Sequence, residues 1–354
     1  MKKIFFSLVA LAALAACSKS EVEYEEATAI RFAPVAHNIT KSVAGVNDNG
    51  THKATFPTDQ DLYIFAVAQD QNADGTFKDT WSTYLNDAQF ISSRISDNGV
   101  YEGNEPYYWP NVKPLKFAGY SEACNSASLN PTMNFTDNKL TITEYVQNNK
   151  DNTAEGTNDL MWFPCDGVSY TKASGAVPAT MKHACSWITV KIIGDGVTGD
   201  NYKIHNLTIN DLYHVGEAVC GNTTATWTTS GTTADEELFS DVDGEIFPKD
   251  KKADNTSNEP KVFENVANNM VIIPQKPTSI NITYSYVPQE GVAAITEVVK
   301  DLDLKITEEA TDAKNLWESG KHYVYTITIT ATEILIDPKV AKWDDVIVGT
   351  TPAI

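Results

Sequence analysis

One cysteine near the start of the chain has neighbours that specify a chemical modification. Cys17 follows Leu14-Ala15-Ala16 at the end of the uncharged apolar run 4–13, and two lysines precede that run. The run is shorter than the roughly 20 apolar residues of a transmembrane helix and is typical of a secretory signal. Small residues before the cysteine suit a signal peptidase, and the thiol receives a diacylglycerol. We therefore predict a lipoprotein with residues 1–17 as signal peptide and lipobox, and with palmitate-type acyl chains anchoring Cys17.

A second candidate site has the spacing of a calcium loop. Asp70, Asn72, Asp74 and Gly75 match the first half of an EF-hand loop, but Trp81 stands where the bidentate carboxylate is expected. An Asn/Asp/Gly-rich hairpin loop is therefore the favoured interpretation, with a metal at these residues as the minor alternative.

Four cysteines remain after the lipobox, and their spacing does not decide their state. None forms a C-x-x-C pair, and an exported chain could oxidise them in three different pairings. Buried thiols that pack as small apolar side chains fit equally well. The sequence leaves both states open for Cys124, Cys165, Cys185 and Cys220.

Residue patterns of enzymes are missing from the sequence. It contains no G-x-S-x-G, H-E-x-x-H, P-loop or dinucleotide-binding glycine pattern. Six histidines are scattered, and His183 and His322 each open a predicted strand, where packing or hydrogen bonding is the commoner role. We predict that the protein is not an enzyme and uses no cofactor.

The overall composition favours an exported β protein. The chain has 354 residues, 27 basic against 47 acidic, and a formal charge of −20, which makes nucleic acid and anionic lipid surfaces poor partners. Its length suits two domains of about 150 residues. Thr, Asn, Tyr and Val are abundant, and long helical patterns are absent, so we predict an all-β fold.

The N-terminal segment combines an acidic tether with a first strand. Residues 18–26 are polar, residues 29–35 are predicted to form an edge or first strand, and a loop of turn residues follows. Lys41, between the strand and the loop, is an accessible site for a trypsin-like protease, with Arg31 and Lys53 as fallback sites. Residues 18–41 are therefore interpreted as a tether and a removable first strand.

The rest of the chain is interpreted as two β domains. Residues 169–180, with Gly and Pro, suggest a boundary, which gives domains at 42–176 and 177–354. In the second domain, residues 183–192 and 322–330 alternate as single long strands. Residues 221–259 have few large apolar side chains and are predicted to be a long surface excursion.

Several of these stretches together resemble the fimbrillins, the pilins of type V pili in Bacteroidetes. The resemblance spans nearly the whole chain, and its most specific parts lie near residues 272–275 and 317–325. The matching residues are the lipobox at Cys17, Ile30 and Phe32 with Thr40-Lys41, Leu115-x-Phe117-x-Gly119-Tyr120, Asp159-Leu160-Met161, His183-Ala184 with Ile188 and Val190, Ile272-Ile273-Pro274-Gln275, and Trp317, Gly320, Lys321, Tyr323 and Tyr325.

This resemblance implies a fold and a function. It implies two tandem β-sandwich domains of transthyretin-like topology, and export to the outer membrane and cell surface as a lipoprotein. It further implies cleavage by an Arg- or Lys-specific protease after the first strand and polymerisation by strand exchange into a fimbrium that supports adhesion. The implied partners are other pilus subunits, outer-membrane lipid through Cys17, and host or bacterial surface ligands.

The C-terminal end of the chain contains two candidate donor strands for polymerisation. The extended C-terminal segments 334–336 and 346–348 are candidate donors, with Val346, Ile347 and Val348 favoured. Residues 334–336 fit equally well as part of their own sandwich.

Because Lys41 stands where Arg is commoner in the family, an unprocessed anchor or accessory subunit stays open as an alternative function. A surface glycan-binding lipoprotein of a nutrient-uptake system is the other alternative.

Overall fold

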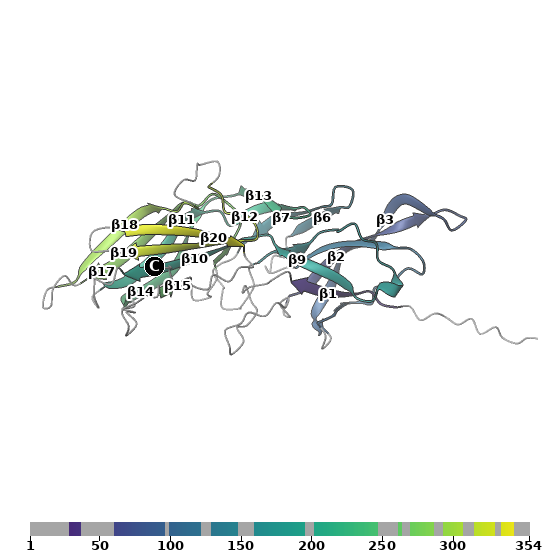
Figure 1. The fold of residues 1–354 in the computed structure, drawn as a ribbon, viewed down its shortest axis with the longest axis horizontal. Helices are drawn as coiled ribbons and strands as arrows, with labels where there is room; N and C mark the ends of the chain where they lie inside the picture. Colours follow the sequence, from purple (N-terminus) through teal and green to yellow (C-terminus); the bar gives the residue numbers. More distant parts are fainter. Residues whose placement is uncertain are drawn as a thin grey trace, which may run out of the picture.

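Strands are the main regular secondary structure of the chain in the computed structural model (Figure 1). The structure describes residues 28–36, 60–95, 99–121, 129–147, 159–194, 202–246, 261–263, 270–286, 293–306, 315–329 and 334–342. Within these ranges the one helix is the short 3-10 turn η1 (Lys172–Ser174). No helix of the described ranges has the length and apolar character to span a membrane. The all-β prediction is confirmed.

Seven strands close into a barrel in the order β1-β4-β3-β2-β5-β8-β9. β1 closes it, because it pairs antiparallel with β4 on one side and parallel with β9 on the other. The strands are β1 (Arg31–Ala36), β2 (Leu62–Gln71), β3 (Phe77–Ile95), β4 (Tyr101–Gly103), β5 (Leu115–Ser121), β8 (Met161–Phe163) and β9 (Val177–His183).

The C-terminal part of the chain forms a sandwich of two sheets. Its core takes apolar side chains from both sheets, among them Ile188, Ile209, Ile282 and Tyr325, as face-to-face packing requires. One sheet has the order β15-β10-β19-β20, with β16 also paired to β10, and the other has the order β14-β11-β17-β18. The strands are β10 (Ser186–Gly194), β11 (Tyr202–Leu212), β14 (Ala234–Ile246), β15 (Lys261–Phe263), β16 (Met270–Ile272), β17 (Ser279–Tyr286), β18 (Ile295–Asp303), β19 (Lys321–Ile329) and β20 (Ile334–Lys342).

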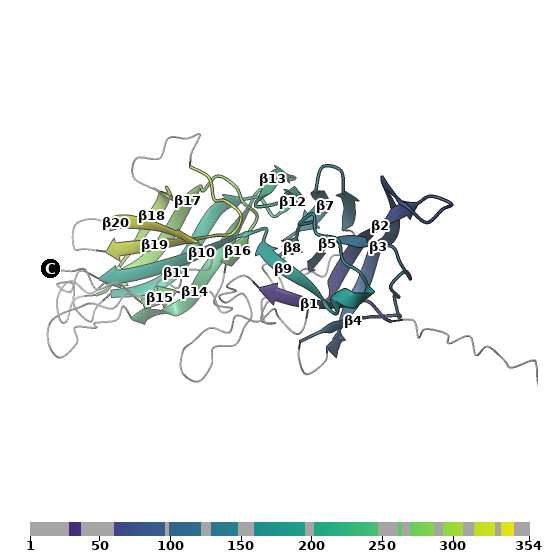
Figure 2. The ribbon, with the colours of Figure 1, turned by 45° about the vertical axis from the view of Figure 1, so that its right-hand side comes forward.

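A third sheet lies between the barrel and the sandwich and joins the two halves of the chain (Figures 1 and 2). Its order is β13-β12-β7-β6, from β6 (Asn130–Asn134), β7 (Lys139–Val146), β12 (Val215–Cys220) and β13 (Ala225–Ser230). The antiparallel pairing of β12 with β7 connects segments far apart in sequence. A separate core packs this sheet against the outer face of the barrel, where Phe65, Tyr120 and Trp162 are buried.

These pairings show where the chain passes between the barrel, the third sheet and the sandwich. The boundary expected between residues 176 and 177 falls directly before β9, which completes the barrel. The chain leaves the barrel at Ala184-Cys185, and the later hairpin of β12 and β13 returns to pair with β7. The transthyretin-like connectivity implied by the resemblance stays a prediction.

Two predicted segments differ from the structure. The expected single strand 183–192 is two strands in different sheets, since the N–H of Ala184 donates to the Leu160 carbonyl and the Cys185 carbonyl accepts from Gly320. The expected excursion 221–259 contains the whole of β13 and of β14. Threonine and acidic side chains are tolerated there because one face of each strand is exposed.

The turn before β19 explains the Trp-x-x-Gly-Lys pattern. The indole Nε1 of Trp317 donates to the Tyr325 hydroxyl at 2.9 Å, and Trp317 is fully buried. Gly320 has a φ of +66°, a conformation that L side chains rarely adopt, and its N–H bonds to Cys185 at 2.8 Å. These contacts tie the start of β19 to the start of β10, its parallel neighbour.

Candidate functional site

The position of β1 in the barrel is the candidate functional site, because β1 is the strand that the proposed processing would remove. Phe32 pairs with Val177 and Ala36 with Met181 in the parallel ladder, while Phe32 pairs with Tyr101 of β4 on the other side. The extension before β1 is also bound, since the Ile30 N–H donates to the Tyr107 carbonyl at 2.7 Å. β1 is therefore a paired wall strand.

Phe32 anchors β1 in the barrel interior. Its ring is fully buried and makes edge contacts with Phe90 and Phe117, at centroid distances of 4.8 and 5.2 Å. Phe163 lies at 6.1 Å in a tilted arrangement. Ile30, two residues earlier on the same face, is 1% exposed. A side chain that occupies the place of Phe32 therefore meets three aromatic rings.

Most of the predicted site residues lie outside the described ranges. They are the lipidation site Cys17, the cleavage sites Lys41 and Lys53, and the donor residues Val346, Ile347 and Val348. The fallback residue Arg31 lies within β1 and forms an exposed ion pair with Glu102 at 3.1 Å. Since its backbone is paired with β4, a protease would have to unpair β1 before cutting there. Of the two candidate donors, residues 334–336 belong to β20 and pair with β19 in their own sandwich.

The calcium-like residues lie in the hairpin that joins β2 to β3, as Figure 1 shows at one end of the barrel. The carboxylate of Asp70 accepts hydrogen bonds from Thr80 and Ser82, which lower its pKa. Asp74 accepts two bonds from Thr76, which likewise lower its pKa. Asn72 donates its amide to the Thr76 hydroxyl. These three side chains make hydrogen bonds within the turn and between the two strands. Among the described residues, no cluster of three His, Cys, Asp or Glu could hold a metal ion.

Three of the four later cysteines are described, and none of these is in a disulfide. Cys165, Cys185 and Cys220 are buried, and burial raises the pKa of the Cys165 and Cys220 thiols. Cys124 lies outside the described ranges. Thiols held in the protonated state are poor nucleophiles, so the structure uses these side chains for packing.

The two histidines considered for catalysis are both packed inside the protein. His183 bonds through Nδ1 to the buried carboxylate of Asp159. The ring of His322 stacks on Trp187 at a centroid distance of 3.5 Å, with Nε2 bonded to the Thr189 hydroxyl at 2.9 Å. Burial, with the nearby charge of Lys191, lowers the pKa of His322 to about 3. His322 is therefore neutral at physiological pH.

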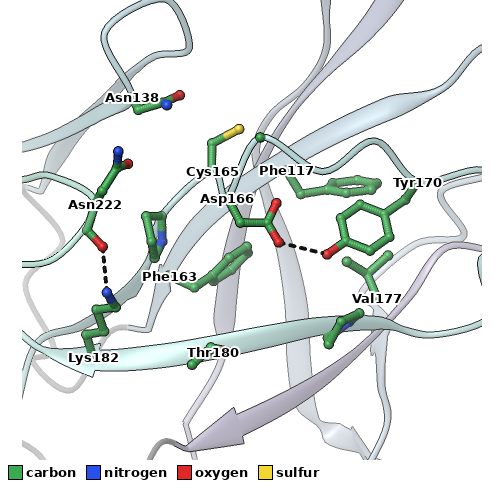
Figure 3. A pocket seen from close by; sticks show the side chains of 13 residues that line it. Phe117, Asn138, Phe163, Cys165, Asp166, Tyr170, Val177, Thr180, Lys182 and Asn222 are labelled. Carbon is green, nitrogen blue, oxygen red and sulfur yellow. Dashed lines mark hydrogen bonds between the residues drawn. The ribbon is translucent and has the colours of Figure 1, made fainter.

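One feature that sequence reasoning missed is an open cavity beside β8 and β9 (Figure 3). Its polar lining includes Asn138, Asp166, Lys182 and Asn222, which come from four different segments of the chain. No local pattern connects these residues, since the pairing of β12 with β7 brings two of the segments there.

Comparison with known proteins gives the family. The profile of the fimbrillin-like family matches residues 42–343, and that of the prokaryotic membrane lipoprotein lipid attachment site matches residues 1–18. No curated protein matches. The lipid attachment site and the fimbrillin-like match indicate a membrane-anchored surface protein. The chain belongs to the fimbrillin-like family.

Solved structures of other proteins are similar to this chain in fold. A fimbrial protein from Bacteroides vulgatus has a TM-score of 0.54 at 14% identity, covering 88% of this chain and 99% of that chain. Proteins described as cell adhesion proteins match less closely in shape. One from Bacteroides ovatus has a TM-score of 0.49 at 15% identity, covering 90% and 98%, and one from Bacteroides uniformis has 0.46 at 18%, covering 88% and 99%.

Proposed function

We propose that this protein is a structural pilus subunit that is exported as an outer-membrane lipoprotein, trimmed after β1 and polymerised by strand exchange. This proposal rests on the position of β1 in the barrel. It is the first described strand, it precedes the predicted cleavage residue Lys41, and its Phe32 fills the centre of the barrel. A protease that cuts after β1 would turn a covalently held wall strand into a replaceable one.

Loss of β1 would create a binding site for another strand. The backbone edges of β4 and β9 would be unpaired, and Phe90, Phe117 and Phe163 would lose their contacts with Phe32. An exposed strand edge beside an apolar slot is a template for a strand from another chain. Each new main-chain hydrogen bond contributes about 1 kcal/mol net, and side-chain burial adds to this.

The proposed donor is the C-terminal segment with Val346, Ile347 and Val348. It follows β20, whose residues already pair with β19, so donation of the later segment leaves the sandwich ladder intact. Other copies or related pilus subunits are thus the proposed partners, with adhesion as a property of the assembled fimbrium. The proposed role is structural, as the fimbrillin-like family to which the chain belongs suggests.

Assembly of cleaved protein tests this proposal. Protein cut at Lys41 should form ladders on gels and filaments by microscopy, while the precursor kept without protease should stay monomeric. Removal of residues 344–354 from the cleaved protein should abolish polymerisation. Truncated protein that polymerises as well as the intact form would show that the C-terminal donor is wrong, and polymerisation of the uncleaved protein would exclude removal of β1.

A further inference from the structure

The cavity beside β9 lies where β8 and β9 share few paired residues. β8 pairs with β9 only through Met161 with His183 and Trp162 with Lys182, after which the chain leaves β8 and returns at Val177. The cavity of about 430 Å³ opens along this gap. Its size is within the range of small-molecule sites.

Aromatic and apolar side chains form one end of the cavity. Figure 3 shows Phe117 and Tyr170 lying together with Val177 on one side of Phe163. Tyr170 donates its hydroxyl to Asp166 at 3.1 Å, so its ring is held in place at the wall. Flat apolar rings of this kind pack against the C–H face of a sugar ring as well as against other apolar groups.

Hydrogen-bonding groups form the opposite end. Asn138 comes from the turn between β6 and β7, Asn222 from the turn between β12 and β13, and Thr180 and Lys182 from β9. Figure 3 shows Lys182 directed toward Asn222 and the Asp166 carboxylate directed away from both, toward Tyr170. Amide and hydroxyl groups both donate and accept hydrogen bonds, as the hydroxyls of a sugar require.

Lys182 supplies a positive charge at this polar end. Its ammonium donates to the Asn222 carbonyl at 2.5 Å, which uses one of its three N–H groups. Within the described part of the chain, Lys182 forms no ion pair with a carboxylate. Partial burial lowers the pKa of Lys182, because the ammonium loses hydration and no described carboxylate pairs with it in compensation. An anionic group of a ligand would provide that compensation.

We propose that this cavity binds a sugar acid, with the carboxylate on Lys182, the hydroxyls on the asparagine and threonine side chains, and the ring against Phe163 and Tyr170. The carboxylate of Asp166 disfavours the reverse orientation, because it would place two negative charges together. The site does not depend on cleavage or strand exchange, since every lining residue is in place with β1 bound.

Saturation-transfer NMR on the uncleaved full chain in detergent tests the proposal with two probes of the same ring. Methyl glucuronide should give saturable signals, and methyl glucoside, which lacks the carboxylate, should bind at least about ten-fold more weakly. Lys182→Gln should weaken glucuronide binding about ten-fold and leave glucoside binding unchanged. Lys276→Gln, at an exposed lysine outside the cavity, is the matched control.

If Lys182→Gln does not fold, the variant Thr180→Tyr tests the cavity independently. Thr180 is exposed on β9 and lines the cavity, so Thr180→Tyr should fill its opening and abolish binding of both sugars while β9 stays paired. Equal binding of the two sugars would overturn the role of Lys182. Absence of saturable binding, or binding unchanged in Thr180→Tyr, would overturn the site itself. Either result leaves the assembly proposal untouched.

Discussion

Phe32 lies directly opposite Val177 in the parallel ladder of β1 and β9, so the earliest described strand closes the barrel against a strand from mid-chain. The same phenylalanine contacts rings from β3, β5 and β8. The barrel therefore depends on a strand that the proposed processing would separate from the rest of the chain.

Truncation of Phe32 should destabilise the uncleaved protein strongly. Phe32→Ala removes a fully buried ring and leaves a cavity, which costs about 3–5 kcal/mol. Arg31→Ala on the exposed face of the same strand should cost less than about 1 kcal/mol. Urea denaturation of both variants measures this difference. Similar small effects for the two substitutions would mean that Phe32 does not anchor β1.

Limited proteolysis should cut the precursor first between residues 31 and 53. Packed and paired strands protect their peptide bonds, so we expect mild trypsin to cut at Lys41 before it enters either β unit. Lys41→Ala should move the first cut to Lys53 and leave Arg31 intact, because Arg31 lies in a paired strand. Mass spectrometry of the first fragments gives the positions. First cuts within 221–259, with residues 17–60 intact, would contradict the processing site.

Membrane attachment should depend on Cys17. The lipid attachment profile covers residues 1–18, and no other residue in that segment has a thiol. Cys17→Ser should release the protein from membranes or leave its signal peptide uncleaved, as seen by fractionation and gel mobility. Unchanged membrane partitioning and mobility of the variant would remove the basis for lipidation.

Acid should destabilise the C-terminal sandwich through His322. Its pKa falls from 6.5 unfolded to about 3 folded because of burial, so the unfolded state binds the proton first. Stability is complete above about pH 6.5 and falls by up to about 1.4 kcal/mol per pH unit as the pH drops toward 3. His322→Phe, which keeps a ring on Trp187, should show a shallower decline in urea titrations between pH 6.5 and 4. Parallel curves for the two proteins would exclude this role.

Gln275 should be a structural residue despite its polar side chain. It is 5% exposed, and its amide both donates to and accepts from the backbone of Tyr213. Gln275→Leu leaves these backbone groups unpaired and should cost about 2–4 kcal/mol. Lys276→Leu at the exposed neighbouring position should change stability little. Equal effects in thermal melts would show that the Tyr213 contacts contribute nothing.

Features that repeat locally could be predicted from the sequence. Alternating apolar residues predicted the strand that became β19, because a strand with one face in the core has period-two patterning. The lipobox and the fimbrillin motifs are also local. Trp317 and Gly320 are among the matching residues, and their contacts form the turn before β19.

Part of the candidate site was visible in the same way. Residues 29–35 were predicted as an edge or first strand, and the structure has β1 there with Ile30 and Phe32 buried. The three rings that surround Phe32 were not predictable as its partners, because strands from three later segments bring them together.

Pairing between distant segments was decided only in the folded chain. β9 closes the barrel, β12 joins β7, and β10 runs parallel to β19, although nothing near these strands in sequence records their partners. Residues 183–192 looked like one strand because alternation continues across Ala184-Cys185, where long-range hydrogen bonds redirect the chain. The cavity beside β9 likewise forms only when distant segments pair, since β12 and β7 bring two of its lining segments together. Backbone hydrogen bonds between strands are nearly the same for any sequence, so they do not select which strands pair. The partner of each strand is selected by the packing of side chains on the two faces of the sheet, which forms only in the folded protein.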